Sequence, residues 1–486
     1  MRRVWIGVLG AAIGCSVAAG QGYVVEQIAG GLNHPLDLAQ APGDATGLYI
    51  AEQRFGMGTT GEPYARILRL DASSGVLTTF LTVDVSLVGD AGLHGLAFHP
   101  DYATNGRVYV TVMEDPPSGN RLLNRLYEYT IKADEEPTRR LVLSYPQNAN
   151  SAIHGIGWIG FRPYAPLAER SWLYVFVGDG GPQASSGSYV NRAQQLDLVY
   201  GKVLRIDVDG EDLYPDDPDR NFGVPMGNPF HDGDPGSLPE VLCSGLRSPW
   251  RGGFDALTGD LLIGDVGFFS REEINIVRPD RLGEDFGWPS REGTIEMPVP
   301  GVGGPRGDSV DPIHEWAHST GNVSITGGLV YRGPIGSLRG RVFFGDYVSG
   351  RVWSGVFDRQ TDPADFNGQN IVGLVEHSVA WNAGLPAGQV IARVVSFATD
   401  LYGNLYVLNY GSGNLVNPTY GTGAVFRLRV LCQADFNGDG LVDFFDVQAF
   451  LGAFATDAPE ADLNGDRAFD FFDVQMYLGL FSAGCG

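Results

Sequence analysis

Lysine is nearly absent from this 486-residue chain, which contains only Lys132 and Lys202, and basic residues as a whole are few. The chain has 33 Lys and Arg residues against 57 Asp and Glu residues, which gives a formal net charge of -24. A surface with that balance repels nucleic acid and anionic membranes. The composition therefore favours cations or neutral molecules as ligands, and any site for an anion must be built from Arg.

Long apolar runs are also lacking, since none beyond the N-terminus is long enough to span a bilayer. At the N-terminus, Arg2-Arg3 precedes an apolar stretch over 4–17 and the small residues Ala18-Ala19-Gly20. This order is typical of a secretory signal peptide, so we expect residues 1–20 to be removed on export to the periplasm or the medium. A lipoprotein signal with Cys15 as the lipidated residue is the alternative.

Cysteine is sparse for an exported protein, with four residues in all. Cys15 leaves with the signal peptide. Cys432 and Cys485 bracket the C-terminal segment, which predicts a disulfide between its two ends. Cys243 is then left over, and we expect it to be a small buried hydrophobic residue.

Helical periodicity is scarce before residue 440, and a pair of short β-rich runs joined by a turn-rich loop recurs instead. Alternating runs bounded by Gly, Pro and Asp favour antiparallel sheets, and repeats of this size suggest propeller blades. We therefore predict an all-β fold, a six-bladed β-propeller over residues 24–430, with a large sandwich or two β domains as the alternative. The six pairs are 48–50 with 67–71, 107–110 with 126–129, 172–175 with 203–207, 260–263 with 273–276, 341–344 with 351–353, and 404–407 with 424–428.

Two loops near the C-terminus have the oxygen spacing of EF-hand calcium loops, and each leads into an amphipathic segment, over 447–454 and 474–481. Calcium prefers six to eight hard oxygen ligands, and this spacing supplies them. The second loop has Arg467 where the first has Gly440, so we expect its turn to be strained. The predicted ligands are Asp435, Asn437, Asp439, Leu441 through its carbonyl, Asp443 and Asp446, then Asp462, Asn464, Asp466, Ala468, Asp470 and Asp473.

The two loops end in Asp rather than Glu, and the duplicated loop–helix layout over 432–486 resembles a dockerin. The resemblance implies a small helical module that docks onto a cohesin-like protein or caps a secreted enzyme. Docking and a passive, calcium-stabilised cap remain equal alternatives from the sequence.

Polar residues in three Gly-rich stretches are the candidates for chemistry in the larger part of the chain. The stretches are 153–163 leading toward 177–181, 245–251, and 264–267 followed by 272–275. A loop histidine such as His154 can act as a general base near neutral pH. A structural histidine with satisfied hydrogen bonds is the competing interpretation.

At these residues the chain resembles the soluble quinoprotein glucose/sorbosone dehydrogenase family, which includes aldose sugar dehydrogenases and the propeller of hedgehog-interacting proteins. The resemblance runs from about residue 24 to 430. It rests on the order and number of several stretches, which are Gly92–Asp101, Gly201–Asp207, Gly283–Pro289, Thr326–Gly333 and Phe344–Arg351.

The resemblance implies a six-bladed propeller that holds pyrroloquinoline quinone (PQQ) and calcium on its axis. It implies that His154 takes the proton of the sugar C1 hydroxyl, that Arg247 stabilises the quinone oxygens, and that hydride transfer to PQQ yields a lactone. Gly267 and Phe268 would offer carbonyls to the calcium. The cofactor would also be contacted by Arg332 and Arg393, by Asp90 at a position where the family has Gln, and by Ser248 where it has Asn; Trp158 stands where it has Arg.

The sequence thus predicts an exported, PQQ- and calcium-dependent oxidoreductase that acts on a small sugar and passes electrons to an unidentified acceptor. A non-catalytic extracellular propeller that binds carbohydrate or protein is the alternative. A third hypothesis is a metal-dependent lactonase, but the carboxylate and amide ligands that such a site requires on several blades are not found in the sequence.

Overall fold

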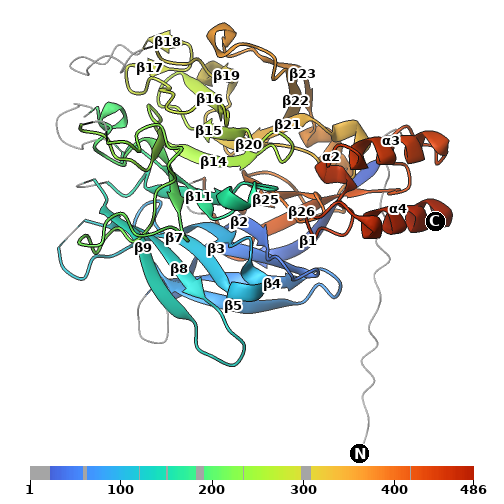
Figure 1. Ribbon diagram of the computed structural model, residues 1–486, viewed down its shortest axis with the longest axis horizontal. Helices are drawn as coiled ribbons and strands as arrows, with labels where there is room; N and C mark the ends of the chain where they lie inside the picture. Colours follow the sequence, from blue (N-terminus) through green and yellow to red (C-terminus); the bar gives the residue numbers. More distant parts are fainter. Residues whose placement is uncertain are drawn as a thin grey trace, which may run out of the picture.

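The computed structural model describes residues 22–57, 63–119, 121–148, 151–181, 191–233, 235–296, 308–415 and 418–485. Its β-strands form six four-stranded antiparallel sheets and a two-stranded hairpin. The sheets are arranged around a centre as the blades of a propeller (Figure 1). The six-bladed β-propeller predicted from the sequence is therefore confirmed.

The strands of each blade are given from the innermost strand to the outermost. The first three blades are β2 (Pro35–Gln40), β3 (Gly47–Met57), β4 (Pro63–Asp71) and β5 (Leu77–Asp84); β6 (Leu93–Phe98), β7 (Arg107–Glu114), β8 (Leu123–Thr130) and β9 (Thr138–Pro146); and β10 (Ile156–Phe161), β11 (Trp172–Val177), β12 (Lys202–Asp207) and β13 (Val241–Cys243). The last three are β14 (Pro249–Phe254), β15 (Leu261–Asp265), β16 (Arg271–Val277) and β19 (His314–Ala317); β20 (Ile325–Val330), β21 (Arg341–Asp346), β22 (Val352–Phe357) and β23 (Ile371–Glu376); and β24 (Val394–Thr399), β25 (Leu405–Asn409), β26 (Gly423–Val430) and β1 (Tyr23–Leu32).

The sixth blade closes the ring, because its outermost strand β1 comes from the N-terminus and its other three strands from the end of the propeller. β1 pairs antiparallel with β26, from Tyr23 opposite Val430 to Leu32 opposite Gly423. The six innermost strands contact one another in the cyclic order β2, β6, β10, β14, β20, β24 and back to β2. These strands surround a central channel.

Hydrophobic packing between neighbouring blades holds the ring together. Adjacent residues of a strand point to opposite faces of its sheet. In β15, Leu261 and Ile263 pack with the third blade, whereas Leu262 packs with the fifth. Six clusters of buried side chains arise in this way, one at each junction between blades. This explains why the central strands are nearly continuous apolar runs.

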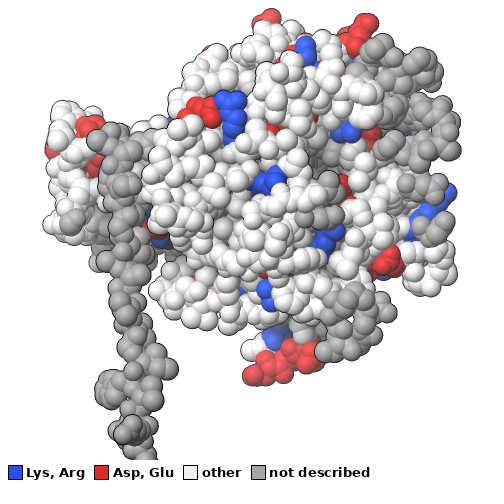
Figure 2. Space-filling view, turned by 180° about the vertical axis from the view of Figure 1, so that it is seen from behind, with Lys and Arg blue, Asp and Glu red and all other residues white. Residues whose placement is uncertain are grey.

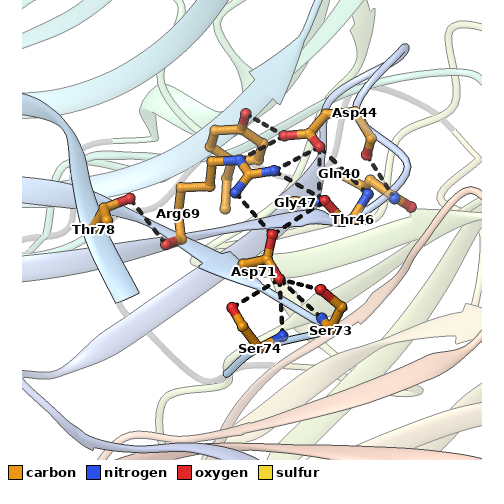
Figure 3. Close-up of polar contacts among 10 residues, drawn as sticks. Gln40, Asp44, Thr46, Gly47, Arg69, Asp71, Ser73, Ser74 and Thr78 are labelled. Carbon is orange, nitrogen blue, oxygen red and sulfur yellow. Dashed lines mark hydrogen bonds and ion pairs between the residues drawn. The ribbon is translucent and has the colours of Figure 1, made fainter. Parts of the chain in front are cut away.

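Charged side chains fix the turns of the first blade (Figure 3). Asp44, between β2 and β3, accepts hydrogen bonds from Arg69 Nε and Nη2, each at 2.7 Å, and from the backbone N–H of Gly47 at 2.9 Å. It also accepts one from the Tyr49 hydroxyl at 2.8 Å. Arg69 lowers the pKa of the Asp44 carboxyl through these bonds. Asp44 thus ties a loop to the two strands behind it.

We expect Asp44→Ala to destabilise the protein by about 2 kcal/mol, because it leaves Arg69 and Tyr49 without their shared acceptor. The shift of the urea unfolding midpoint measures the effect. Asp115→Ala is the control, since Asp115 is exposed. Equal midpoints for the two variants would show that the Asp44 contacts contribute nothing to stability.

Beyond the propeller, two helices and the loops before them form the C-terminal module, residues 432–485. The helices lie next to each other at one side of the molecule (Figure 1), with Phe450 stacked on Tyr477 at 4.2 Å between ring centroids. The disulfide between Cys432 and Cys485 is present, and Cys243 is buried, both as predicted.

The α-helices of the described residues are α1 (Tyr102–Asn105) and α2 (Ser378–Gly384) in the propeller and α3 (Phe444–Phe454) and α4 (Phe471–Ala483) in the module. The two-stranded hairpin is β17 (Arg291–Glu292) with β18 (Ile295–Glu296).

The described part of the chain contains no helix that is long and apolar enough to cross a membrane. On the face shown in Figure 2, the described Lys and Arg side chains are scattered among uncharged residues and form no continuous basic patch. The predicted signal peptide, residues 1–20 with Cys15, lies outside the described residues.

Candidate functional site

The central channel has two mouths, which differ in the residues around them. The front mouth is the end at which the six inner strands begin, and the back mouth is the end at which they finish. Six residues at a rise of about 3.3 Å each separate the two mouths by ~20 Å. His34, His154, Ser248 and Arg393 lie at or next to the starts of inner strands, whereas Arg162, Asp255, Arg332 and Asp400 follow their ends.

His154 and Asp179 form a hydrogen-bonded pair at the front mouth, 2.8 Å apart between Nδ1 and Oδ1. His154 adopts a left-handed backbone conformation, with φ of 55°, and a side chain at Gly178 would lie 2.4 Å from its carbonyl oxygen. Both side chains of the pair are 11% exposed. A carboxylate only accepts hydrogen bonds, so Nδ1 carries the proton and Nε2 keeps a lone pair.

Trp288 and Gly181 hold the Asp179 carboxylate in place. Trp288 Nε1 donates to Oδ2 at 2.9 Å, and the Gly181 N–H donates to Oδ1 at 2.8 Å. Burial opposes ionisation of Asp179, but the contacts with His154, the charge of Arg247 and the Gly181 N–H together outweigh it and lower the pKa of this carboxyl. Asp179 is therefore ionised near neutral pH and orients the imidazole.

Arg247 occupies the wall beside this pair. Its guanidinium lies over the Phe268 and Trp288 rings, 5.1 and 5.6 Å from their centroids. Its Nη1 donates to the carbonyl oxygens of Val266 and Gly267, each at 2.7 Å. The backbone carbonyl of Arg247 accepts the Asp179 N–H at 2.8 Å. Arg247 and the His154–Asp179 pair therefore belong to one rigid unit.

Asp265 anchors the backbone of this wall. It accepts the N–H groups of Arg247 at 2.9 Å and Ser248 at 2.6 Å. Burial raises the pKa of Asp265 to about 7. The loop between β15 and β16 is also held by a carboxylate, because Glu292 accepts the N–H groups of Phe268, Phe269 and Ser270.

Asp90 lies beside His154 at the front mouth, where its N–H donates to the Ala152 carbonyl at 2.9 Å, and Arg54 is close to Asp90. Arg54 Nη2 donates to the Gly89 carbonyl at 2.7 Å, and its buried Nε has no hydrogen-bond partner among the described residues. Desolvation by the surrounding protein raises the pKa of the Asp90 carboxyl, although His154 and Arg54 oppose the shift. Gln53 supports this corner by donating to the Asp90 carbonyl at 2.7 Å. The front mouth thus combines acidic and basic groups around His154.

Arg393 completes the basic groups of this mouth. It directly precedes β24, donates through Nη2 to the Gly413 carbonyl at 2.6 Å, and lies over the Tyr347 ring at 5.9 Å. Arg54, Arg247 and Arg393 therefore come from three different blades and share one end of the channel.

Arg332 lies at the opposite end, which corrects its assignment to the cofactor site. It follows β20 at the back mouth and pairs with Asp255 through two hydrogen bonds of 2.8 and 2.7 Å. The sequence resemblance placed it in the cofactor site by its position in the stretch Thr326–Gly333, but the strand in that stretch, β20, leads away from His154. Trp158 lies farther along β10, with its ring against Phe176 at 4.9 Å.

The sequence did not single out Asp179, Trp288 and Arg54 as site residues. Asp179 follows β11 in the Gly-rich stretch 177–181, so a search for a carboxylate partner of His154 could have found it. Trp288 comes from the long connection between β16 and β19, and Arg54 from the end of β3. Neither carries a local sequence signal, because only the ring of blades brings them to His154.

In the C-terminal module, the two predicted calcium loops are wound alike. Asp435 accepts the N–H groups of Gly438, Asp439 and Gly440 within 3.0 Å, and Asp462 accepts the corresponding three within 3.1 Å. Arg467 has φ of 65°, so the predicted strain at this turn is present. No group of three or more His, Cys, Asp or Glu side chains in the described residues is arranged to hold a metal ion.

The front mouth fits an anionic, aromatic cofactor. Three guanidinium groups can meet carboxylates, the buried Arg54 Nε needs an acceptor, and the Phe268 and Trp288 rings offer flat surfaces. The carbonyls of Val266 and Gly267 converge on one cationic nitrogen, which is the hard-oxygen chemistry that calcium takes. A calcium ion there has to displace Arg247 Nη1 from these carbonyls.

Residues 59–371 match the family model described as Glucose / Sorbosone dehydrogenase. The chain belongs to this family. Among curated relatives of this glucose/sorbosone dehydrogenase-family chain, HIPL2 protein of Arabidopsis thaliana is 26% identical over 397 residues, which cover 70% of the chain and 55% of the relative. Quinoprotein glucose dehydrogenase B of Acinetobacter calcoaceticus is 27% identical over 295 residues, covering 57% of the chain and 54% of the relative. The chain therefore spans about half the length of these relatives.

The propeller fold of this chain is also found in a solved structure. The PQQ-bound form of aldose sugar dehydrogenase from Streptomyces coelicolor superimposes with a TM-score of 0.57 at 21% identity, covering 84% of this chain and 98% of the other. This likeness concerns the fold alone.

Proposed function

We propose that this chain is a PQQ-dependent dehydrogenase that oxidises the C1 hydroxyl of aldose sugars to lactones. The observation that carries the proposal is the His154–Asp179 pair beside Arg247, at one mouth of a propeller of the glucose/sorbosone dehydrogenase family. Relatives described as quinoprotein glucose dehydrogenase and aldose sugar dehydrogenase support the reaction class.

In this proposal His154 is the general base. Nε2 takes the proton of the C1 hydroxyl, and Asp179 stabilises the imidazolium that results. When bound, PQQ supplies the two-electron acceptor for the hydride that leaves C1. The guanidinium of Arg247 stabilises negative charge that develops next to His154. Proton and hydride together account for the two electrons and two hydrogens that an aldose loses on becoming a lactone.

Arg54, Arg247 and Arg393 are the groups proposed to hold the cofactor carboxylates, with Asp90 and Ser248 at the same mouth. The Gly267 and Phe268 carbonyls, with the Val266 carbonyl that converges with that of Gly267, would hold a calcium ion, which would supply Lewis-acid polarisation of the cofactor. Arg332 has no part in this site.

Reconstitution tests the proposal. The purified chain is titrated with PQQ and calcium while the cofactor absorbance is followed, and dye reduction by aldoses is then measured. We expect binding at or below micromolar PQQ and sugar-dependent dye reduction. An unchanged cofactor spectrum at micromolar PQQ would rule the proposal out.

A non-catalytic binding propeller is the second candidate, and Asp90 is the observation that favours it. A carboxylate at the front mouth opposes an anionic cofactor, and HIPL2 protein and hedgehog-interacting protein are among the relatives. Binding of glycans without dye reduction, in a chain that does not bind PQQ, would favour this candidate.

The raised pKa of Asp90 predicts how cofactor binding depends on pH. Asp90 becomes ionised as the pH rises through this raised pKa, and its charge then repels the cofactor carboxylates. We expect PQQ to bind about tenfold more tightly to Asp90→Asn than to the wild type at pH 8, with the difference vanishing at low pH. Fluorescence titration across pH measures it, and a difference that is independent of pH would contradict this role of Asp90.

We further propose that the two loops of the C-terminal module bind calcium and that the protein is exported. The spacing of their oxygens and their matching backbone wrapping support calcium binding. The charged and apolar N-terminal residues and the Cys432–Cys485 disulfide support export to an oxidising compartment. Calorimetric titration with calcium, and detection of the mature N-terminus outside the cytoplasm, test these two statements.

A further inference from the structure

The C-terminal halves of the inner strands enclose a cavity of about 240 Å³, which ends at the back mouth. All six inner strands line it, and residues of the C-terminal module, Pro459 and Arg467, lie at its end. A neighbouring cleft between the propeller loop 162–170 and the module is also lined by Arg467. The module is thus seated where the channel would otherwise open.

The second loop of the module makes specific contacts with this mouth. The Tyr164 hydroxyl donates to Asp462 Oδ2 at 3.1 Å, and the Tyr164 ring stacks on Phe469 with 5.8 Å between centroids. Tyr164 and Arg467 both have left-handed backbones, with φ of 51° and 65°. Left-handed non-glycine residues are costly and persist where the surrounding contacts require them. Two such residues therefore meet across one interface.

The first loop contacts the neighbouring turn of the propeller. Arg339 Nη1 donates to the Phe436 carbonyl at 2.7 Å, and its guanidinium lies 4.1 Å from the Phe436 ring centroid. Gly336 packs so closely that a side chain there would lie 2.8 Å from the Asn437 carbonyl oxygen. Hydrogen bonding, ring stacking and close backbone packing at separate points make this a specific interface.

The attachment of the module is short. Only Leu431 separates the end of β26 from Cys432, and the Cys432–Cys485 disulfide returns the end of the module to the same point. The loops, rather than the outer sides of α3 and α4, face the propeller. A separate protein that recognised the loop face would have to detach the module first.

We infer that the partner of the C-terminal module is the propeller of its own chain, and that the module closes the back mouth of the channel. Tyr164, Arg339 and Arg467 make the closure. The Arg at position 467, where the first loop has Gly440, is explained by its place at the mouth, because Gly440 makes no such contact. One part of this inference, the calcium arm, rests on the proposed function: it states that calcium bound in the second loop makes the closure more rigid. The rest of the inference does not depend on calcium.

Hydrogen exchange on the full chain tests the closure. The amides of 162–171 and 331–340 are followed in wild type, Tyr164→Phe and Arg467→Gly, each in EGTA and in calcium. Loss of one interface hydrogen bond, worth about 1 kcal/mol, predicts exchange about fivefold faster in these segments for Tyr164→Phe. Arg467→Gly is expected to speed exchange too, although glycine relieves the strain of the loop itself. Arg359→Gln is the control, because Arg359 pairs with Asp260 away from the module.

Each result decides one statement. If Tyr164→Phe and Arg467→Gly exchange at the wild-type rate, the module does not close the mouth. If calorimetry shows no calcium binding but both variants exchange faster in EGTA, the closure stands and the calcium proposal falls. If calcium binds and leaves exchange in the two segments unchanged, the closure is independent of calcium and the calcium arm is wrong.

Discussion

Replacing His154 by Ala is expected to lower kcat of the PQQ- and calcium-loaded protein by about 10³-fold or more, while PQQ binding changes little. General-base catalysis contributes about 10² to 10⁴ in rate, and Trp288, which also donates a hydrogen bond to Asp179, has no basic nitrogen that could replace His154. Steady-state dye reduction with an aldose gives kcat, and absorbance titration gives the affinity for PQQ.

The matched control for this change is His231→Ala. His231 lies on the connection between β12 and β13, away from the front mouth, and contacts Asp232 at the surface. We expect wild-type kcat from it. A His154→Ala protein that retained a tenth of wild-type kcat would show that the proton leaves the C1 hydroxyl by another route.

Asp179→Asn is expected to lower kcat by about a hundredfold without unfolding the site. The amide is close to the carboxylate in shape, but it cannot compensate an imidazolium, and its NH₂ group can force the wrong tautomer on His154. The Trp288 and Gly181 donors lose a charged acceptor at the same time. The pH profile of kcat/KM is the second measurement, because loss of the carboxylate should shift its acidic limb to lower pH.

Trp288→Phe separates this role from simple packing. It removes the donor to Asp179 Oδ2 while keeping an aromatic ring under Arg247. We expect a loss of kcat much smaller than that of Asp179→Asn. If Asp179→Asn lowered kcat and thermal stability but left the pH profile unmoved, the carboxylate would be structural.

The fold followed from the sequence because the two middle strands of every blade carry a clear pattern. Each of the six pairs predicted from apolar runs corresponds to the second and third strands of a blade, such as β3 with β4. The inner strands are harder to see because neighbouring blades meet there without room for side chains. A side chain at Gly327 would lie 2.0 Å from the Arg251 carbonyl oxygen. Glycine at such positions replaces the β-branched and aromatic residues by which a strand is recognised in a sequence.

The outer strands are difficult to predict from the sequence because they are exposed. β23 is exposed along nearly its whole length after Ile371, so burial imposes no alternation on it. Its place in the blade is fixed by pairing with β22, by the burial of Ile371 and by hydrogen bonds from Arg341 and Arg351.

Most of the predicted site residues that the structure brings together lie just before inner strands, and Gly267 and Phe268 follow β15. His154, Arg247, Ser248 and Arg393 are those before inner strands, and the structure brings them to one mouth. Arg332 has the same chemistry but follows its inner strand, β20, whereas the others precede theirs. Sequence spacing does not show which strand of a blade is the innermost, so it does not show at which end of the propeller Arg332 lies.

The pairing of β1 with β26 has a consequence for biogenesis. β1 is synthesised long before its partner β26, so the ring cannot close until β26 has emerged. Contacts of such long sequence separation slow folding. The unpaired edges of β1 and β25 are exposed during that wait, and unpaired edges invite aggregation. A chaperone that shields strand edges would therefore be needed most before β26 (Gly423–Val430) emerges.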